Sequence, residues 1–384
     1  MQFKDIHGHE NIKRKLINTV KDNRISHAQL FLGGEGCGKL SLALAYAQYI
    51  ACKNKTDNDS CGVCPECVKF NKLIHPDLHF VYPVVTSAKF SKPVSDDYLT
   101  EWRKFVLKRN YHSLNDWLDE MGSENAQCAI FAQESQEILK KLSRKSFESE
   151  YKTMIIWMPE KMNETAANKL LKLIEEPPDK TLFLLVSENE EEILNTIRSR
   201  TQLIKIDRPT KENIIESLDN EFPQAAKQAK ENAAIIAQGN YIEALKALGQ
   251  YTGDNVESTE FQYFTTLMRS SYANNYADMI KLCETLSKIG REKQKKFLDY
   301  CGRLIRECFI MNIAAAESNK LVNLTPGEKM FAQKFSPFIH NNNIKMLSDE
   351  FSKAYMRIER NGYNKLVFMN LCLVTSAGLR INKA

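Results

Sequence analysis

The stretch GGEGCGKLS at residues 33–41 constrains the fold more than any other part of this sequence. It follows the apolar run QLFL (29–32) and leads into the apolar, alanine-rich segment LSLALAYAQYIAC (40–52). A glycine-rich turn between a buried strand and a helix is the setting of the phosphate-binding loop, G-x-x-x-x-G-K-[ST]. The sequence therefore predicts an α/β domain built around such a P-loop.

The loop departs from the working pattern at one position. Gly33, Gly38 and Lys39 are in place, as a phosphate-binding loop requires. Leu40, however, stands where a hydroxyl would hold the magnesium ion of a bound nucleotide. Ser41 comes one residue late, and one residue is about 100° of helical rotation, so its hydroxyl should point away from the metal site. Lys39 and the loop amides still suit a phosphate, because amides at a helix N-terminus attract anions.

A P-loop ATPase also needs acidic residues at the end of a second strand, where they hold magnesium and orient the attacking water. The candidate strand is TMIIW (153–157), and the residues at its end are Trp157 and Met158, which do neither. Glu160 comes two residues later and is expected to begin the next turn. These losses from two separate segments predict a site that does not hydrolyse ATP, and they leave nucleotide binding doubtful.

Short apolar runs without in–out alternation predict parallel strands that are covered on both faces. They lie at 29–32, 79–85, 153–157, 181–186 and 202–206. Helical patterns lie between them, which predicts a doubly wound α/β domain. After Pro209 the strand signal ends, and helical patterns continue to the C-terminus. The predicted organisation is an α/β domain over 1–208, a small helical lid over 209–252 and an all-helical domain over 256–384.

Two helical regions admit more than one interpretation. Residues 86–130 interrupt the α/β pattern, and we interpret them as a helical insertion whose role the sequence leaves open. Their basic side chains suit a solvated face better than a DNA contact. Between residues 297 and 309, apolar residues recur at helical spacing. We interpret that stripe as internal packing of an all-helical domain and not as an oligomerisation surface.

Four cysteines lie close together in CKNKTDNDSCGVCPEC, namely Cys52, Cys61, Cys64 and Cys67. Four soft thiolates at this spacing suit tetrahedral Zn²⁺ and leave no open position, so we predict a structural zinc site. The alternatives are unligated thiols, a redox pair, or a zinc ribbon that grips nucleic acid. The last is weak, because the lysines of this region are offset by nearby acidic residues.

The length, net charge and cysteine count of the chain argue against several classes of protein. The chain has 384 residues, and Lys+Arg exceeds Asp+Glu by 53 − 48 = 5, which is not by itself a DNA-binding footprint. No apolar signal core begins the sequence and no apolar run of membrane-spanning length occurs in it, so we expect a cytoplasmic protein with no membrane contact. In that compartment, ten cysteines favour thiols or metal ligation over disulfides.

Three segments and the cysteine set carry a resemblance to a known family. The opening FKDIHGHENIKRKLINTVKDNRISHAQLFLGGEGCGK, the stretch AANKLLKLIEEPP (166–178) and the stretch TIRSRTQ (196–202) are similar to bacterial clamp-loader subunits of DNA polymerase III. The cysteines stand where those subunits carry a zinc module. The third stretch resembles a Ser-Arg-Cys signature, which reads Ser199-Arg200-Thr201 here. The resemblance covers about residues 1–250 by motif.

The resemblance implies an AAA+ domain, a helical lid and an all-α collar that joins subunits into a ring. The gamma/tau subunits of that family keep an intact P-loop and acid pair, so this chain resembles the subunit type that cannot hydrolyse ATP. The implied partners are gamma/tau and delta subunits, the sliding clamp and primed DNA, within a holoenzyme that is a DNA-directed DNA polymerase. The lid's sensor arginine is absent, since that stretch reads Gly239-Asn240-Tyr241-Ile242.

By the same resemblance, Arg200, with Ser199 beside it, is the candidate catalytic residue in trans. An arginine finger that reaches into a neighbour's ATP site is worth about 10³–10⁵ in rate. The simpler alternative for Arg200 is a salt bridge at the start of a strand. Two other functions stay open: an active gamma/tau-type ATPase, which turnover by the isolated chain would favour, and a zinc-bearing module that binds DNA in a salt-dependent way.

Overall fold

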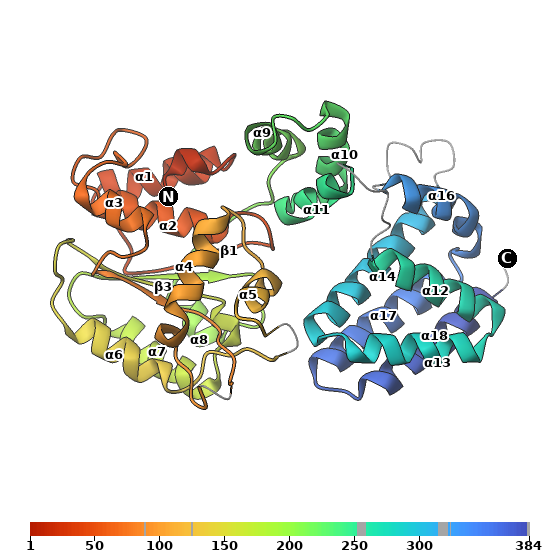
Figure 1. The fold of residues 1–384 in the computed structure, drawn as a ribbon. Coiled ribbons are helices and arrows are strands. Elements are labelled where there is room, and N and C mark those ends of the chain that lie inside the picture. The colour runs from red at the N-terminus through yellow and green to blue at the C-terminus, as the bar shows by residue number, and fades with distance from the viewer. Residues whose placement is uncertain (88–89, 124–125, 252–258, 314–321, 323, 382–384) are drawn as a thin grey trace. The chain divides into compact units, whose positions relative to one another are not determined.

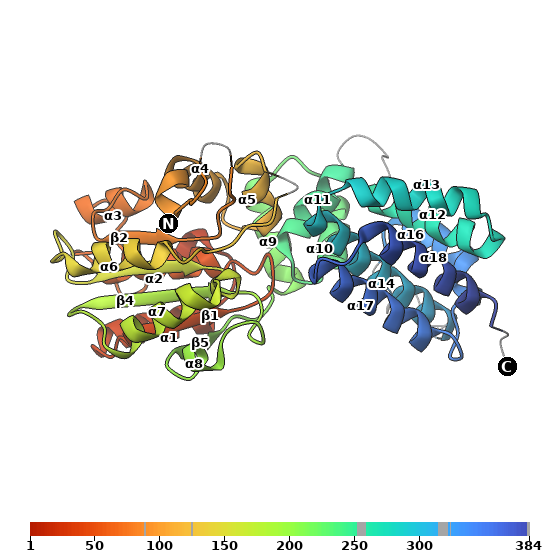
Figure 2. The same ribbon diagram turned by 90° about the horizontal axis from the view of Figure 1, so that it is seen from below.

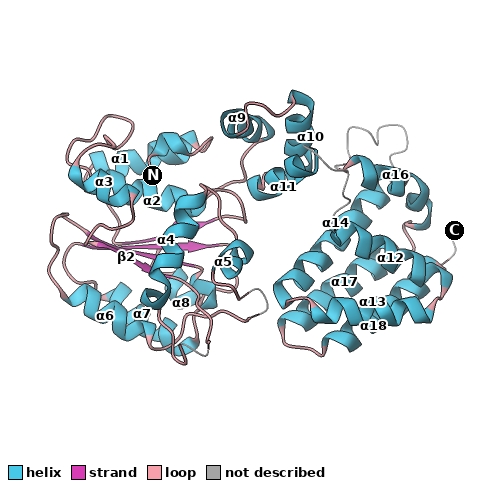
Figure 3. Cartoon of the chain, viewed as in Figure 1, coloured by secondary structure: helices cyan, strands magenta, loops and turns pink. Residues whose placement is uncertain are grey.

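The computed structural model describes residues 1–87, 90–123, 126–251, 259–313, 322 and 324–381. The chain forms two compact units, Met1–Lys246 and Ala247–Ala384. The first contains a parallel sheet covered by helices, and the second is all helical (Figures 1 and 3). The predicted fold class, an α/β domain with a parallel sheet and a P-loop, followed by helical segments, is confirmed. Among the described residues, no helix combines the length and the apolar character needed to cross a bilayer.

A five-stranded parallel sheet forms the centre of the first unit. Its strands are β1 (Ala28–Leu32), β2 (Leu78–Val81), β3 (Lys152–Trp157), β4 (Thr181–Ser187) and β5 (Gln202–Lys205). Their order across the sheet is β2-β3-β4-β1-β5 (Figure 2). β1 lies between β4 and β5, and Leu32 is in register with Ser187 and Lys205. The loop that follows β1 is therefore next to the end of β4.

The prediction of strands covered on both faces holds for four of the five. It is wrong for β5, where Leu203 has 46% of its surface exposed and only Ile204 is partly covered. β5 lies at the edge of the sheet and pairs on one side only, with β1. Its apolar run reads like a buried strand, but its place in the sheet leaves it exposed.

Helices cover both faces of the sheet (Figures 1 and 2). On one face lie α1 (Glu10–Lys21), α2 (Lys39–Ala51) and α3 (Pro65–Asn71). On the other lie α6 (Glu134–Ser143), α7 (Glu164–Glu175) and α8 (Asn195–Arg198). Successive strand residues point to opposite faces, so Phe31 and Leu184 join the core beneath α2, while Leu30 and Leu185 join the core beneath α7.

The segment 86–130 packs onto the sheet's own core. It contains η2 (Ser95–Tyr98), α4 (Leu99–Lys108) and α5 (Leu114–Glu120), and its residues 88–89 and 124–125 lie outside the described part. Trp102 and Trp117 are fully buried in the same core as α2. Trp102 stacks on Tyr82 with ring centroids 4.0 Å apart and contacts Trp157 at 5.3 Å. Trp157, at the end of β3, therefore serves packing where an ATPase would have an acid.

The region expected to be a lid forms α9 (Lys211–Glu221), α10 (Lys227–Ala237) and α11 (Tyr241–Tyr251). The first two helices and the start of α11 belong to the first compact unit. The expected boundaries at 252 and 256 fall among residues 252–258, which lie outside the described part.

The second unit is built from helices around one core. They are α12 (Thr259–Ala273), α13 (Tyr276–Lys288), α14 (Arg291–Ile313), α16 (Pro326–Phe335), η4 (Ser336–Phe338), α17 (Ile344–Glu359) and α18 (Asn364–Leu379). The apolar stripe of α14 packs inside this core, with Phe297, Leu304 and Cys308 fully buried. The interpretation of that stripe as internal packing is confirmed.

Candidate functional site

The P-loop connects β1 to α2, as its sequence predicts. Gly36 and Gly38 have φ angles of 71° and 83°, in the left-handed region that glycine enters without strain. The side chain of Leu40 is buried in the core. The hydroxyl of Ser41 donates a hydrogen bond to the carbonyl oxygen of Asn110, so it is turned away from the loop and toward the segment between α4 and α5.

The lysine of the loop is already paired within the chain. Lys39 is 3% exposed, and its ammonium donates to the Gly34 carbonyl oxygen at 3.1 Å. The same ammonium lies 2.8 Å from a carboxylate oxygen of Glu188, the residue that follows β4. Burial acts to lower the pKa of Lys39, but the carboxylate of Glu188 outweighs it and the pKa is raised. The lysine is charged, and the chain's own carboxylate neutralises it.

A second carboxylate lies behind this pair. Met158 has a left-handed φ of 56°, which turns the chain after β3 into η3 (Pro159–Lys161). There a carboxylate oxygen of Glu160 accepts the backbone N–H of Glu188 at 3.0 Å. Burial raises the pKa of Glu160, so it favours the protonated form. Glu160 lies in the turn after β3, as the sequence predicts. Two acids thus lie near the loop: Glu188 pairs with Lys39, and Glu160 accepts the backbone N–H of Glu188.

The segment between α10 and α11 also covers the loop. The backbone N–H of Tyr241 donates to the Gly36 carbonyl oxygen at 3.2 Å. A Cβ atom on Gly36 would lie 1.9 Å from the amide oxygen of Asn240, which shows how closely the two segments meet. The ring of Tyr111 lies against Gly38 and packs on the ring of Tyr241 with centroids 4.3 Å apart. The stretch 239–242, where the family has a sensor arginine by resemblance, thus packs against the P-loop instead.

The four predicted cysteines come together at the far end of α2. Cys52 follows the last residue of α2, and Cys64 immediately precedes α3, which carries Cys67. All four sulfur atoms lie within 4.8 Å of one another, with Cys61–Cys67 and Cys52–Cys64 separations of 3.9 Å and 4.0 Å. Thiolates bound tetrahedrally to Zn²⁺ at about 2.3 Å would be about 3.8 Å apart, so this donor set fits zinc.

Backbone amides support the thiolate form at one of these cysteines. The Cys64 N–H donates to the Cys61 sulfur at 3.3 Å, and the Cys61 N–H donates to the Cys52 sulfur at 3.3 Å. Amides of Val63 and Cys64 lower the pKa of Cys61 to about 6. Burial raises the pKa of Cys67, so a cation is the natural partner that would hold all four as thiolates.

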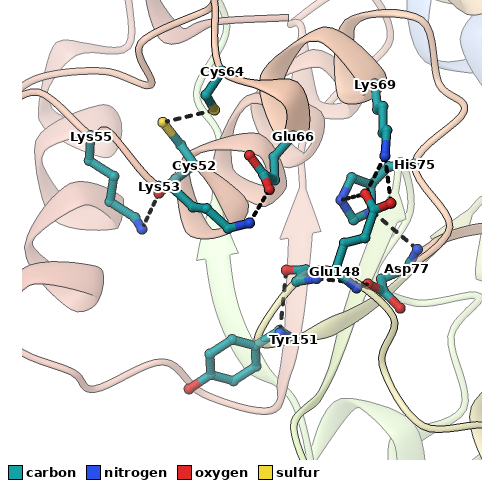
Figure 4. Close-up of polar contacts among 11 residues, drawn as sticks. Cys52, Lys53, Lys55, Cys64, Glu66, Lys69, His75, Asp77, Glu148 and Tyr151 are labelled. Carbon is teal, nitrogen blue, oxygen red and sulfur yellow. Dashed lines mark hydrogen bonds and ion pairs between the residues drawn. The ribbon is translucent and has the colours of Figure 1, made fainter.

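The lysines of this module are engaged with its own groups (Figure 4). Lys53 pairs with Glu66, and Lys55 donates to the Cys52 carbonyl oxygen at 2.6 Å. Lys69 pairs with Glu148, in the loop before β3. Two of these three lysines are therefore paired with carboxylates, which does not favour nucleic-acid binding through the module.

A separate carboxylate fastens the loop that precedes β3. Asp77 accepts the backbone N–H groups of Phe147, Glu148 and Ser149 at 2.7–2.8 Å. Figure 4 shows Asp77 beside Glu148. It comes from the His75-Pro76-Asp77 turn directly before β2. The loop before β3 is thus held both by Asp77, before β2, and by Lys69 of α3.

Arg200 lies on the surface between α8 and β5. Its Nε lies 2.6 Å from a carboxylate oxygen of Glu175, and one Nη donates to the Thr196 carbonyl oxygen at 3.0 Å. The Arg200 side chain is 41% exposed. Ser199 donates its hydroxyl to the same Thr196 carbonyl oxygen at 3.1 Å. The salt bridge considered as the simpler alternative is present, and it is exposed.

The structure does not bring Arg200 and the P-loop together. Arg200 precedes β5, whereas Gly33 follows β1, and these strands are parallel neighbours with Gln29 in register with Gln202. The two sites therefore lie at opposite ends of these strands. Arg200 is not placed to act on the phosphate loop of its own chain.

Comparison with known proteins identifies relatives for most of the chain. A family model described as DNA polymerase III, delta subunit, matches residues 8–210. The delta' subunit of DNA polymerase III from Bacillus subtilis (strain 168) is 26% identical over 275 residues, covering 72% of this chain and 64% of that protein. The delta' subunit from Haemophilus influenzae is 27% identical over 328 residues, covering 84% and 83%.

A second type of DNA polymerase III subunit is also similar. The tau subunit of DNA polymerase III from Bacillus subtilis is 24% identical over 314 residues, covering 78% of this chain and 48% of that protein. The chain thus spans less than two thirds of the length of both Bacillus relatives.

Proposed function

This chain belongs to the DNA polymerase III delta subunit family, and from that membership we propose that it is a non-hydrolysing, delta-prime type subunit of a clamp loader. In this role it helps to place the sliding clamp on primed DNA during replication. Its partners are gamma/tau and delta subunits, the clamp and, through the assembled complex, DNA. Similarity to both delta' and tau subunits supports this placement.

The observation that carries the proposal is the internal pairing of Lys39. A nucleotide phosphate would have to displace the carboxylate of Glu188, which lies 2.8 Å from the lysine in a largely buried setting. The missing hydroxyl at Leu40 and the missing acids at Trp157 and Met158 act in the same direction, because none of these three side chains offers an oxygen to magnesium. We therefore propose that Gly33, Gly38 and Lys39 form a degenerate P-loop that does not turn over ATP.

Arg200 supplies the active part of the proposed function. Its guanidinium is exposed near the start of β5, at the end of the strands that is opposite to the P-loop. A group in that position is available to the ATP site of a neighbouring subunit, where a planar, permanently charged donor stabilises charge on the transferred phosphate. Ser199 fixes the turn that presents it.

The domain roles follow from the same proposal. Residues 1–208 form the AAA+ body, including the cysteine module (52–67) and the insertion (86–130). Residues 209–252 form the lid and residues 256–384 the collar through which subunits assemble. The contacts of Asn240 and Tyr241 with Gly36 support a lid that is closed without nucleotide.

We propose that Cys52, Cys61, Cys64 and Cys67 hold a structural Zn²⁺. Bound zinc would cross-link the end of α2 to α3 and would leave no position open for catalysis. Metal analysis of the purified chain should give one zinc per chain, and Cys67→Ser should lower that ratio, whereas Cys308→Ser, in the helical unit, should not. Equal zinc in both variants would contradict this assignment.

The test of the proposed function is the ATPase rate of a reconstituted loader with clamp and primed DNA. We expect Arg200→Ala to lower the rate by about 10³-fold per affected site. Arg198→Ala is a matched control, since Arg198 has a similarly exposed side chain (40%) and pairs with Glu190. Assembly of each complex is checked by gel filtration.

The isolated chain provides the remaining arm of the test. It should show no ATP turnover. A rate above background would favour the alternative, an active gamma/tau-type ATPase, and would contradict the non-hydrolysing role. If Arg200→Ala assembles and turns over ATP like the wild type, the arginine-finger role fails and the chain is a passive member of the ring.

A further inference from the structure

Glu175 is the last residue of α7, and its carboxylate contacts the arginine discussed above. Pro177 and Pro178 follow and prevent the helix from continuing, so the position of Glu175 at the helix end is fixed by the chain. From there it lies 2.6 Å from the Nε of Arg200. The contact joins α7 to the turn after α8, two segments 25 residues apart in the sequence (200 − 175 = 25).

We propose that Glu175 is a positioning residue for Arg200, which it holds in the orientation needed to reach a neighbour's nucleotide phosphate. This inference rests on the proposed function of Arg200. Glu175 itself contacts no reacting atom in this scheme.

The pattern of hydrogen bonds is what supports positioning. The Glu175 carboxylate forms an ion pair at Nε, and Nη1 donates to the Thr196 carbonyl oxygen and to the Ser199 hydroxyl. Within the described residues, the Nη2 group donates to no protein acceptor. Nε and Nη1 are thus engaged by neighbouring groups of the chain, and Nη2 is left available for the oxygens of a phosphate.

The ion pair between Arg200 and Glu175 is exposed to solvent. Both side chains are more than 40% exposed, at 41% for Arg200 and 44% for Glu175. An exposed ion pair is weak, because water screens both charges. Because the pair is exposed, the part of the guanidinium that Glu175 does not contact faces solvent, where a phosphate can bind it while Glu175 stays in place.

The test is the ATP turnover of the reconstituted loader with Glu175→Ala. We expect kcat to fall about two- to fivefold, the range that the strength of an exposed ion pair allows. KM should stay unchanged, because an arginine finger acts on the transition state. Glu175→Gln keeps the acceptor oxygen and should stay close to wild type. Glu176→Ala, at the neighbouring exposed glutamate, is the matched control and should have no effect.

Repeating the test in the Arg200→Ala variant distinguishes a positioning role of Glu175 from a structural one. With Arg200→Ala already present, Glu175→Ala should cause no further loss of rate, because there is no arginine left to position. An equal loss in both backgrounds would overturn the inference, as would a Glu175→Ala rate equal to or above that of the wild type. If Arg200→Ala alone has no effect, the proposed function has failed; if only Glu175→Ala has none, this inference alone has failed.

Discussion

Two ion pairs of the first unit have nearly the same geometry and opposite surroundings. Lys39 and Glu188 lie 2.8 Å apart with side chains 4% and 25% exposed, and Arg200 and Glu175 lie 2.6 Å apart with side chains 41% and 44% exposed. Breaking a buried pair leaves a charge without water or partner, whereas an exposed pair exchanges its partner for water. The difference indicates that Lys39 of the P-loop is held by contacts within the chain, whereas Arg200 is accessible at the surface.

The largest expected effect comes from removing the buried cation. Lys39→Ala leaves Glu188 without its partner and should lower the free energy of unfolding by about 3 kcal/mol, the low end for buried pairs because Glu188 is partly exposed. Arg200→Ala should lower it by less than about 1 kcal/mol. Denaturant unfolding of the isolated chain measures both. Equal losses would show that the two pairs do not differ as their burial suggests.

Removing the buried carboxylate should convert the closed loop into an anion site. Glu188→Ala leaves the Lys39 ammonium and the loop amides without a counter-charge, which inorganic pyrophosphate can supply. At tenfold excess over its Kd, pyrophosphate should stabilise this variant by about 1.4 kcal/mol in thermal unfolding and should not stabilise the wild type.

Glu190→Ala is the control for that experiment, since Glu190 pairs with Arg198 on the surface. A wild-type chain that pyrophosphate stabilises as much as Glu188→Ala would contradict the idea that Glu188 closes the loop. In that case the P-loop would already be an open anion site.

A smaller, pH-dependent effect is expected at Glu160. Burial raises its pKa above the usual 4.5, so the folded chain keeps this proton at pH values where the unfolded chain has lost it. Stability contributed by Glu160 is therefore present below pH 4.5 and is lost as the pH rises through the folded pKa. Glu160→Gln should be more stable than the wild type at pH 8 and equal to it near pH 4.5.

Unfolding of both proteins across this pH range measures the difference. Glu191→Gln, at an exposed glutamate, serves as the control and should change stability little at either pH. A Glu160→Gln variant that is less stable than the wild type at pH 8 would show that Glu160 is ionised in the fold and needed as an acceptor.

The sequence predicts the parts of this site that depend on local patterns. The five strands, α2 after the loop and the four cysteines all have signals within a few residues, and all are where those signals place them. The lack of magnesium ligands at the end of β3 is also predictable from the sequence, because the side chains of Trp157 and Met158 have no oxygen atoms.

What closes the loop depends on contacts between distant segments. Glu188 pairs with Lys39, 149 residues earlier in the chain. Tyr111, between α4 and α5, packs on Tyr241 at the start of α11. An acid after an apolar run is too common to be assigned a partner by pattern alone. The exposure of Leu203 was hidden for a similar reason, since the order of strands in the sheet and not the composition of β5 decides it.

The smallest effect gives the sharpest comparison of the two pairs. A double-mutant cycle on Arg200 and Glu175 should give a coupling of about 0.5 kcal/mol at low salt and close to zero in about 1 M salt, where the Debye length is about 3 Å. The same cycle on Lys39 and Glu188 should change little with salt, because the low-dielectric surroundings of a buried pair exclude mobile ions. Chemical unfolding of the isolated chain at two salt concentrations measures both couplings. If salt weakens both equally, the Lys39 pair is accessible to solvent ions, and the P-loop is more open than its contacts with Glu188 and Tyr241 indicate.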